Sequence, residues 1–269
     1  MELKSNVTDT ALIFEGGGMR GAFTAAIVTS LLGAGIHMDY VAGISAGSSN
    51  TVNYLSRAPV RARKSFVDFA DDPRFGSWRT WIRGKGFFNA HYIYEECWLP
   101  DGPLPFDFDT FMANPARFKI GSYDVELGKT VYWSREDITQ PVDLMRRVRA
   151  SSSIPGMMPS VWLDGRLYVD GALGEGGGIP LPIAQRDGNT KFFVVLTRTR
   201  DYIKEQYRPQ ALYKLLYGKH PTVAAGILAR AKAYNDTREE LLELERAGQA
   251  LLVFPDQITI ENRTSNVAQ

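Results

Sequence analysis

The sequence predicts an α/β fold in which a mainly parallel sheet is covered by helices. Two short apolar runs near the N-terminus, at residues 11–14 and 40–44, each lead through a glycine-containing turn into a longer helical pattern. Two strand–loop–helix units in succession imply a parallel sheet with helices packed on it. Strand-like runs later in the chain extend that sheet.

The first two units can be followed along the chain. Residues 11–14 form the first expected strand, and the glycine-rich loop behind it leads into a helix over 22–32. Gly33 and Gly35 can end this helix, because glycine accepts the left-handed backbone of a helix C-terminus. Residues 40–44 form a second buried strand, which runs directly into a helical segment that ends near residue 58.

The middle of the chain has a less regular pattern. Residues 63–114 mix aromatic side chains with proline, glycine and charged residues, and they predict short helices and loops. Strand-like runs at 118–124 and 129–134 flank a short turn and predict a strand pair. Pro141 then begins a helix over 142–150.

The last third returns to strands and a helix. Residues 167–169 and 192–197 are strand-like, and residues 250–254 form a closing strand. Between them, residues 222–248 carry apolar side chains at helical spacing with many charges on the other face. This pattern predicts a long surface helix.

The chain has 269 residues, which is enough to bury a full hydrophobic core. It contains no internal repeat, low-complexity tract or clear linker. We therefore predict one domain over residues 1–269, with residues 200–269 as a C-terminal extension of helix and strand.

Charge and composition exclude several function classes. The 31 Lys and Arg residues nearly cancel the 30 Asp and Glu residues, so the net charge of +1 gives no long-range field to attract nucleic acid. The three histidines and the single cysteine, Cys97, form no cluster with the spacing of a zinc site. We expect no metal, no organic cofactor and no nucleic-acid partner.

The same features predict a location. A single cysteine cannot form an internal disulfide, which fits a reducing cytoplasm. The polar N-terminus lacks the apolar core of a secretory signal, and no apolar run approaches the roughly 20 residues of a membrane-spanning helix. We expect a cytoplasmic protein whose contact with lipid, if it has any, is peripheral.

The segment Gly43-Ile44-Ser45-Ala46-Gly47 matches the pattern G-x-S-x-G. It lies where a predicted strand meets a predicted helix, which is the context of a nucleophile elbow. Sterics explain why glycine stands at positions 43 and 47, because a Cβ on either side would crowd the sharp turn that carries the serine. Ser45 is therefore a candidate nucleophile, although an ordinary tight turn explains the bare pattern equally well.

A glycine-rich loop lies between the first predicted strand and helix. It comprises Gly16, Gly17, Gly18, Met19, Arg20 and Gly21. The loop satisfies the G-x-G-x-x-G pattern of dinucleotide-binding folds, but the second strand ends in Ser45 instead of the acidic residue that would hold a ribose. Adjacent glycines also expose backbone N–H groups that can stabilise an oxyanion.

Asp170 is the best-placed base for this serine. It ends a predicted strand and is followed by Gly171 and Ala172. A carboxylate can accept the serine proton directly if burial makes it more basic. Each of the three histidines has a structural explanation that is simpler than catalysis, but His220 remains an alternative as the histidine of a Ser-His-Asp triad.

Four motifs in this order, GGGMRG, GISAG, ASSSIP and DGA, resemble the patatin-like phospholipase family. The resemblance covers residues 11–185. It implies a three-layer α/β/α sandwich with Ser45 as nucleophile and Asp170 as proton acceptor. It further implies an oxyanion hole formed by the backbone amides of Gly17, Gly18 and Met19. The loop after the aspartate resembles a bacterial branch of the family, enlarged here by three glycines at 176–178.

The function expected from this resemblance is a serine acyl hydrolase that cleaves lipid carboxylic esters, of the phospholipase A, lysophospholipase or esterase type, through an acyl-enzyme. The substrate would be a lipid or a small ester. Three alternatives stay open at this point. The first is a Ser-His-Asp esterase that uses His220, and the second is a nucleotide-binding regulatory domain that uses the loop from Gly16 to Gly21. The third is a hydrolase-like protein that binds a partner through the helix at 222–248. The aromatic segment 75–111 fits a lid, an interface or core packing, and the sequence predicts no oligomeric state.

Overall fold

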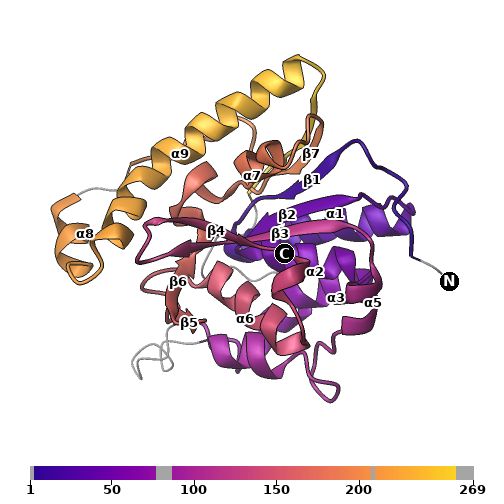
Figure 1. The fold of residues 1–269 in the computed structure, drawn as a ribbon, viewed down its shortest axis with the longest axis horizontal. Helices are drawn as coiled ribbons and strands as arrows, with labels where there is room; N and C mark the ends of the chain where they lie inside the picture. Colours follow the sequence, from indigo (N-terminus) through magenta and orange to yellow (C-terminus); the bar gives the residue numbers. More distant parts are fainter. Residues whose placement is uncertain (1–2, 77–86, 207–209, 259–269) are drawn as a thin grey trace.

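The computed structural model describes residues 3–76, 87–206 and 210–258. Its strands form one sheet with the pairing order β5-β6-β3-β2-β1-β7-β8, and β4 pairs with β3 (Figure 1). The strands are β1 (Ala11–Phe14), β2 (Tyr40–Ile44), β3 (Arg117–Asp124), β4 (Lys129–Trp133), β5 (Val161–Leu163), β6 (Arg166–Asp170), β7 (Phe192–Val195) and β8 (Ala250–Val253).

The sheet is parallel in its centre and antiparallel at one side. The pairs β1–β2, β1–β7, β2–β3 and β7–β8 are parallel, whereas β4 and β6 run antiparallel to β3, and β5 runs antiparallel to β6. The fold is therefore the mixed α/β fold that the sequence predicts, with a mainly parallel central sheet.

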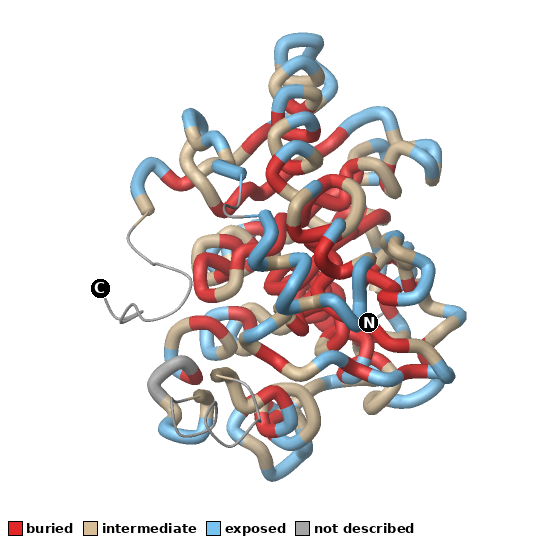
Figure 2. Tube along the Cα trace, turned by 90° about the vertical axis from the view of Figure 1, so that its left-hand side faces the viewer, coloured by how far each residue is buried: buried red, intermediate tan, exposed pale blue. Residues whose placement is uncertain are grey.

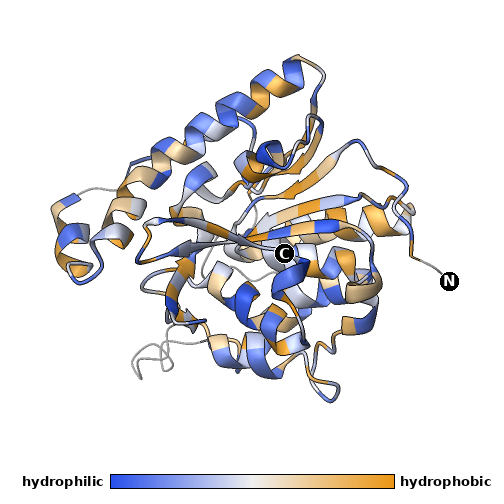
Figure 3. Ribbon diagram, viewed as in Figure 1, coloured by the Kyte–Doolittle hydropathy of each residue, from blue (hydrophilic) through white to orange (hydrophobic). Residues whose placement is uncertain are grey.

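Helices cover both faces of this sheet (Figure 1). One layer contains α1 (Gly21–Gly33), α2 (Ala46–Leu55), α3 (Pro59–Phe66), α5 (Phe108–Ala113) and α6 (Pro141–Ser152). The other contains α7 (Leu181–Arg186) and α9 (Pro221–Arg246), and α8 (Gln210–Leu216) leads into α9. Figure 2 shows the buried residues in the middle of the molecule, and Figure 3 shows apolar residues along β1 and β7.

The two cores follow from the alternation of side chains along a strand. Leu12 and Phe14 of β1 belong to the core beneath α1, α2 and α6, whereas Ala11 and Ile13 belong to the core beneath α7 and α9. A strand buried on both faces is a continuous apolar run, which is the pattern that residues 11–14 show. Both helix layers thus pack on one sheet.

The register around β3 positions the candidate site. β4 occupies one edge of β3 over residues 120–124. Within this range β3 also pairs with β2 and with β6, so β2 and β6 must both lie along its other edge. β2 runs parallel to β3 and ends at Ile44, opposite Gly121; β6 runs antiparallel and ends at Asp170, opposite Ser122. Because Gly121 and Ser122 are consecutive, the two strands meet end to end.

Some elements differ from the expectation. The helix after Ser45 ends at Leu55, and a separate helix, α3, begins at Pro59, because Arg57 takes a left-handed backbone (φ 53°) and proline favours a helix start. The short strand β5 was not expected, since it has three residues and exposes Trp162. Within the described residues, no helix combines the length and apolar character that crossing a bilayer requires.

Candidate active site

Ser45 lies at the turn between β2 and α2 with a strained backbone, φ 57° and ψ −127°. The flanking glycines permit this turn. A Cβ on Gly43 would lie 2.2 Å from the carbonyl oxygen of Gly47, and a Cβ on Gly47 would lie 2.2 Å from that of Phe14. The five-residue pattern therefore forms the sharp strand-to-helix turn that presents a serine side chain.

Ser45 and Asp170 are hydrogen-bonded to each other. The Ser45 hydroxyl donates to Oδ2 of Asp170 over 2.7 Å, and Oδ1 of Asp170 accepts from the backbone amide of Ala172 over 2.8 Å. Both side chains are buried, with exposed fractions of 5% for Ser45 and 2% for Asp170. The end-to-end meeting of β2 and β6 thus brings the two sequence-predicted residues into direct contact.

Burial makes Asp170 a stronger base than an ordinary carboxylate. Its pKa is raised above the usual value of 3.8 because desolvation penalises the charged form. The positive charge of Arg230 and the hydrogen bonds from Ala172 and Ser45 act in the opposite direction and lower this pKa. The net shift is upward, which suits a group that must take a proton from a hydroxyl.

Ser151 is a further residue of the site; the sequence singled out the ASSSIP block that contains it but assigned this serine no role. Its hydroxyl accepts a hydrogen bond from the Ser45 backbone amide over 2.9 Å and donates to the carbonyl oxygen of Gly121. It therefore ties the strained turn to β3. Its place in the ASSSIP block was the available signal, because a small polar side chain is what such a bridge requires.

The glycine-rich loop packs directly against the turn at Ser45. A Cβ on Gly16 would lie 3.0 Å from Cβ of Ser45, and a Cβ on Gly17 would lie 2.6 Å from the Thr197 hydroxyl oxygen. The Gly16 amide donates to the carbonyl of Gly178 over 2.9 Å. Gly16 is therefore needed for the close approach to Ser45, and Gly17 for the close approach to Thr197.

The amides of Gly17, Gly18 and Met19 precede the hydrogen-bonded part of a short 3₁₀ helix, Gly18–Arg20. Its first bonds run from the Arg20 amide to Gly17 and from the Gly21 amide to Gly18, so the three earlier amides have no acceptor within the helix. Gly18 also takes a left-handed backbone (φ 56°). The loop therefore carries amides without a partner in the helix next to Ser45, and the oxyanion hole expected from them stays a prediction.

Gly21 and Gly171 have packing roles at the same site. A Cβ on Gly21 would lie 2.9 Å from Cβ of Ala46, at the start of α2. A Cβ on Gly171 would lie 2.5 Å from the carbonyl oxygen of Gly121, where β2 and β6 meet. Both glycines let the backbone segments around Ser45 and Asp170 approach one another.

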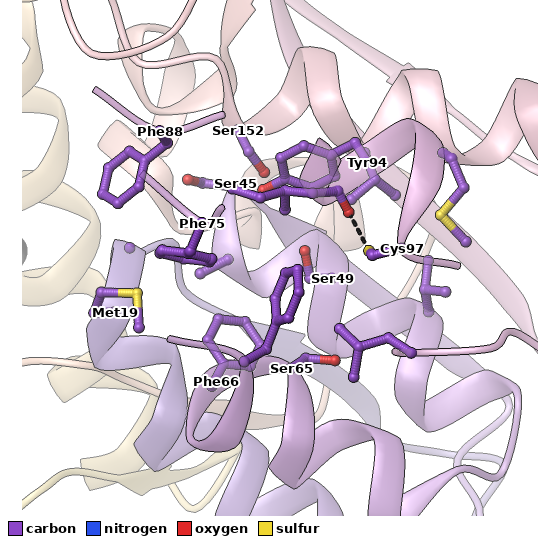
Figure 4. Close-up of a pocket in the computed structure, with 18 of the residues that line it drawn as sticks. Met19, Ser45, Ser49, Ser65, Phe66, Phe75, Phe88, Tyr94, Cys97 and Ser152 are labelled. Atoms are coloured by element: carbon purple, nitrogen blue, oxygen red, sulfur yellow. Dashed lines mark hydrogen bonds between the residues drawn. The ribbon is translucent and has the colours of Figure 1, made fainter. Parts of the chain in front are cut away.

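A mainly apolar cavity of about 110 Å³ opens from Ser45 between α2, α3, α6 and the aromatic segment (Figure 4). Its walls include Phe66, Phe75, Phe88, Tyr94 and Met158. Other aromatic residues of the segment pack in the core instead: Phe106, Phe108 and Phe111. The aromatic segment 75–111 therefore contributes both to the cavity wall and to the hydrophobic core. Trp78 and Trp81 lie outside the described residues.

The histidines lie elsewhere. Among the described residues, no histidine lines either of the two cavities that contain Ser45. His220 is exposed at the N-terminus of α9, and His91 is exposed and lies 2.8 Å from Glu96. The structure brings Asp170, and not His220, to the serine.

Comparison with known proteins shows the family. A model described as patatin-like phospholipase matches residues 12–184, and a second, described as a domain of unknown function (DUF6363), matches residues 220–269. The chain therefore belongs to the patatin-like phospholipase family. Membership in this family supports lipid acyl hydrolase activity and a lipid substrate.

Two individual proteins are also similar. The uncharacterized protein YjjU of Escherichia coli (strain K12) is 29% identical over 198 residues, which are 70% of this chain and 51% of that protein. The chain thus spans about half the length of this curated relative. The crystal structure of VipD from Legionella pneumophila aligns with a TM-score of 0.46 and 12% identity, over 77% of this chain and 53% of VipD.

Proposed function

We propose that this protein is a serine hydrolase that cleaves carboxylic esters of lipids through an acyl-enzyme on Ser45, with Asp170 as its base. The observation that carries the proposal is the 2.7 Å hydrogen bond from the Ser45 hydroxyl to a buried carboxylate. A nucleophile in contact with its base at a strained strand-to-helix turn is the arrangement that acyl transfer requires.

In the proposed reaction, Asp170 accepts the Ser45 proton while Oγ attacks the ester carbonyl. The amides of Gly17, Gly18 and Met19 hold the resulting oxyanion. As the tetrahedral intermediate collapses, the ester C–O bond breaks and the proton passes from Asp170 to the leaving alcohol. Water then attacks the acyl-enzyme, again losing its proton to Asp170, and the fatty acid leaves as Ser45 recovers its proton.

The alternatives from the sequence receive less support from this geometry. A Ser-His-Asp mechanism needs an imidazole between the serine and the carboxylate, but Ser45 contacts Asp170 directly. A nucleotide site needs the glycine loop to face a phosphate at an open helix start, whereas here the loop packs against the turn at Ser45. The cytoplasmic location and the single domain remain predictions.

Labelling with a fluorophosphonate probe tests the proposal. The probe phosphonylates activated serines, so we expect the wild-type protein to be labelled and Ser45→Ala to remain unlabelled. Ser48→Ala is a matched control, because Ser48 is a buried serine of α2, the helix that follows Ser45, and its hydroxyl donates to the Ser45 carbonyl. An unlabelled wild type, or equal labelling of Ser45→Ala, contradicts the proposal.

The raised pKa of Asp170 predicts the acid limb of the pH profile. The base works only when deprotonated, so kcat/KM should fall as the pH drops through the pKa of Asp170, which lies above the ordinary 3.8. The measurement is kcat/KM for a soluble short-chain ester across the acid range, with the fold monitored by circular dichroism. An acid limb at or below pH 3.8 would disagree with the assignment.

The apolar cavity predicts the acyl-chain preference. Ser65 of α3 lies across the cavity from Ser45 (Figure 4), so Ser65→Phe should fill its far end. We expect kcat/KM for long-chain p-nitrophenyl esters to fall about tenfold or more, with smaller losses for acetate and butyrate esters. Ser30→Phe is the control, because Ser30 is exposed on α1 and makes the same helical hydrogen bond. A parallel loss for all chain lengths would refute the assignment of this cavity.

A further inference from the structure

A second cavity of about 110 Å³ adjoins Ser45 and differs in character from the apolar one. It is lined by Ser45, Asp170 and the glycine loop, and also by two arginines, Arg20 and Arg230. Apolar side chains, among them Phe88 and Met157, complete its lining. Ser45 therefore lines both an apolar cavity and a cavity that two arginines also line. Two chemically different halves of one substrate can be accommodated in this way.

Arg230 reaches this cavity because α9 packs closely on the glycine turn at 176–178. A Cβ on Gly177 would lie 2.6 Å from the backbone nitrogen of Tyr234, and Gly177 itself takes a left-handed backbone (φ 60°). The carbonyl of Gly177 accepts a hydrogen bond from Nε of Arg230 over 3.4 Å. The three inserted glycines thus place an arginine of the C-terminal extension beside the dyad.

The terminal nitrogens of Arg230 are available to a ligand. In the part of the chain that the structure describes, they contact no carboxylate and donate no hydrogen bond. Arg20 is more fully engaged: its Nε donates to the carbonyl of Thr197 over 3.1 Å, and its charge interacts with Glu15. Arg230 is therefore the side chain best placed to receive an anion.

Lys204 and Arg198 add to the positive charge near Arg230. Lys204 lies over the ring of Tyr234, with its Nζ 4.4 Å from the ring centroid. Burial, and then the charge of Arg230, lower the pKa of Lys204 to about 7. Arg198 also interacts with Lys204, and its Nε is buried without a hydrogen-bond partner among the described residues. The carboxylate of Glu15 offsets part of this charge by raising the pKa of Lys204, and an anion bound beside Arg230 would offset more of it.

We propose that the second cavity binds the phosphate group of a glycerophospholipid or lysophospholipid substrate, with Arg230 as its main ligand. This inference rests on the proposed function. The acyl chain would occupy the apolar cavity, the ester carbonyl would lie at Ser45, and the phosphate would face Arg230, whose planar guanidinium suits two-point contact with phosphate oxygens. Arg230 lies outside the matched phospholipase region, so the C-terminal extension would complete the site.

The test compares two soluble substrates that differ only in the phosphate, 1-hexanoylglycerol and its 3-phosphate. We expect the wild type to prefer the phosphate ester, and Arg230→Gln to lower the ratio of the two kcat/KM values about tenfold or more. Using the ratio cancels the influence of Arg230 on Asp170, which is common to both substrates. Arg230→Lys should retain part of the preference, because it keeps the charge but loses the two-point contact.

Arg246→Gln is the matched control, since Arg246 is exposed near the end of the same helix. It should leave the ratio unchanged. An unchanged ratio in Arg230→Gln, or a wild type that prefers the neutral ester, overturns the inference. Inorganic phosphate should inhibit the phosphate ester competitively in the wild type; activation by free phosphate would indicate an effector site and would also overturn it. If neither ester is hydrolysed, the proposed function itself fails.

Discussion

Asp170→Asn is expected to lower kcat for ester hydrolysis by about 10⁴-fold. The amide keeps the size of the carboxylate but cannot accept the Ser45 proton, so Oγ would attack as a neutral hydroxyl. His220→Ala is expected to stay within about twofold of the wild type, because His220 is exposed and outside both cavities. Steady-state kinetics on one soluble ester measure both variants.

The opposite pattern, with activity lost in His220→Ala and retained in Asp170→Asn, would exclude Asp170 as the base and indicate His220 instead. Thermal unfolding serves as the folding control. A raised pKa means that the folded state binds this proton more tightly than the unfolded state, so the stability contribution of the carboxyl is greatest below pH 3.8 and is lost as the pH rises through the folded pKa. At neutral pH, removing the buried charge should therefore not lower Tm.

Gly47→Ala is expected to lower the free energy of unfolding by about 4 kcal/mol or more, or to prevent soluble expression. The added Cβ would lie 2.2 Å from the carbonyl oxygen of Phe14 and 2.9 Å from its carbonyl carbon. Both atoms belong to the backbone of β1, a central strand, and no side-chain rotation can relieve the overlap. Urea unfolding followed by tryptophan fluorescence measures the change.

Gly33→Ala is the control for that substitution. Gly33 ends α1, and a Cβ there would have no neighbouring atom within 4 Å. We expect this variant to be unchanged or about 0.5–1 kcal/mol more stable, because alanine lowers the entropy of the unfolded chain. Similar unfolding midpoints for Gly47→Ala and Gly33→Ala would mean that the tight contact between α2 and β1 does not contribute to stability.

The sequence predicted those parts of the fold that depend on local patterns. The strands β1 and β2 could be predicted because they are continuous apolar runs. The turn at Ser45 could be predicted because its flanking glycines avoid a steric clash. The position of β6 was not readable. Its pairing with β3, antiparallel and beside the end of β2, depends on partners distant in the sequence. The contact between Ser45 and Asp170 was therefore a hypothesis until the register was known.

The same limit applies to α9. Its helical character was predicted from its spacing, and the structure confirms a helix over Pro221–Arg246. Its polar positions look alike in the sequence, however, and Figure 3 shows polar and apolar residues along its whole length. Only packing on the glycine turn distinguishes Arg230, which faces the dyad, from an exposed arginine such as Arg246.

The end-to-end meeting of β2 and β6 has a consequence for how activity is acquired during folding. Ser45 and Asp170 are 125 positions apart and touch only when both strands have docked on β3 in the correct register. A slip of one residue in β6 would turn the carboxylate of Asp170 to the opposite face. Since distant strand pairings form slowly, enzymatic activity should return after compaction and most helical signal when the unfolded chain is refolded.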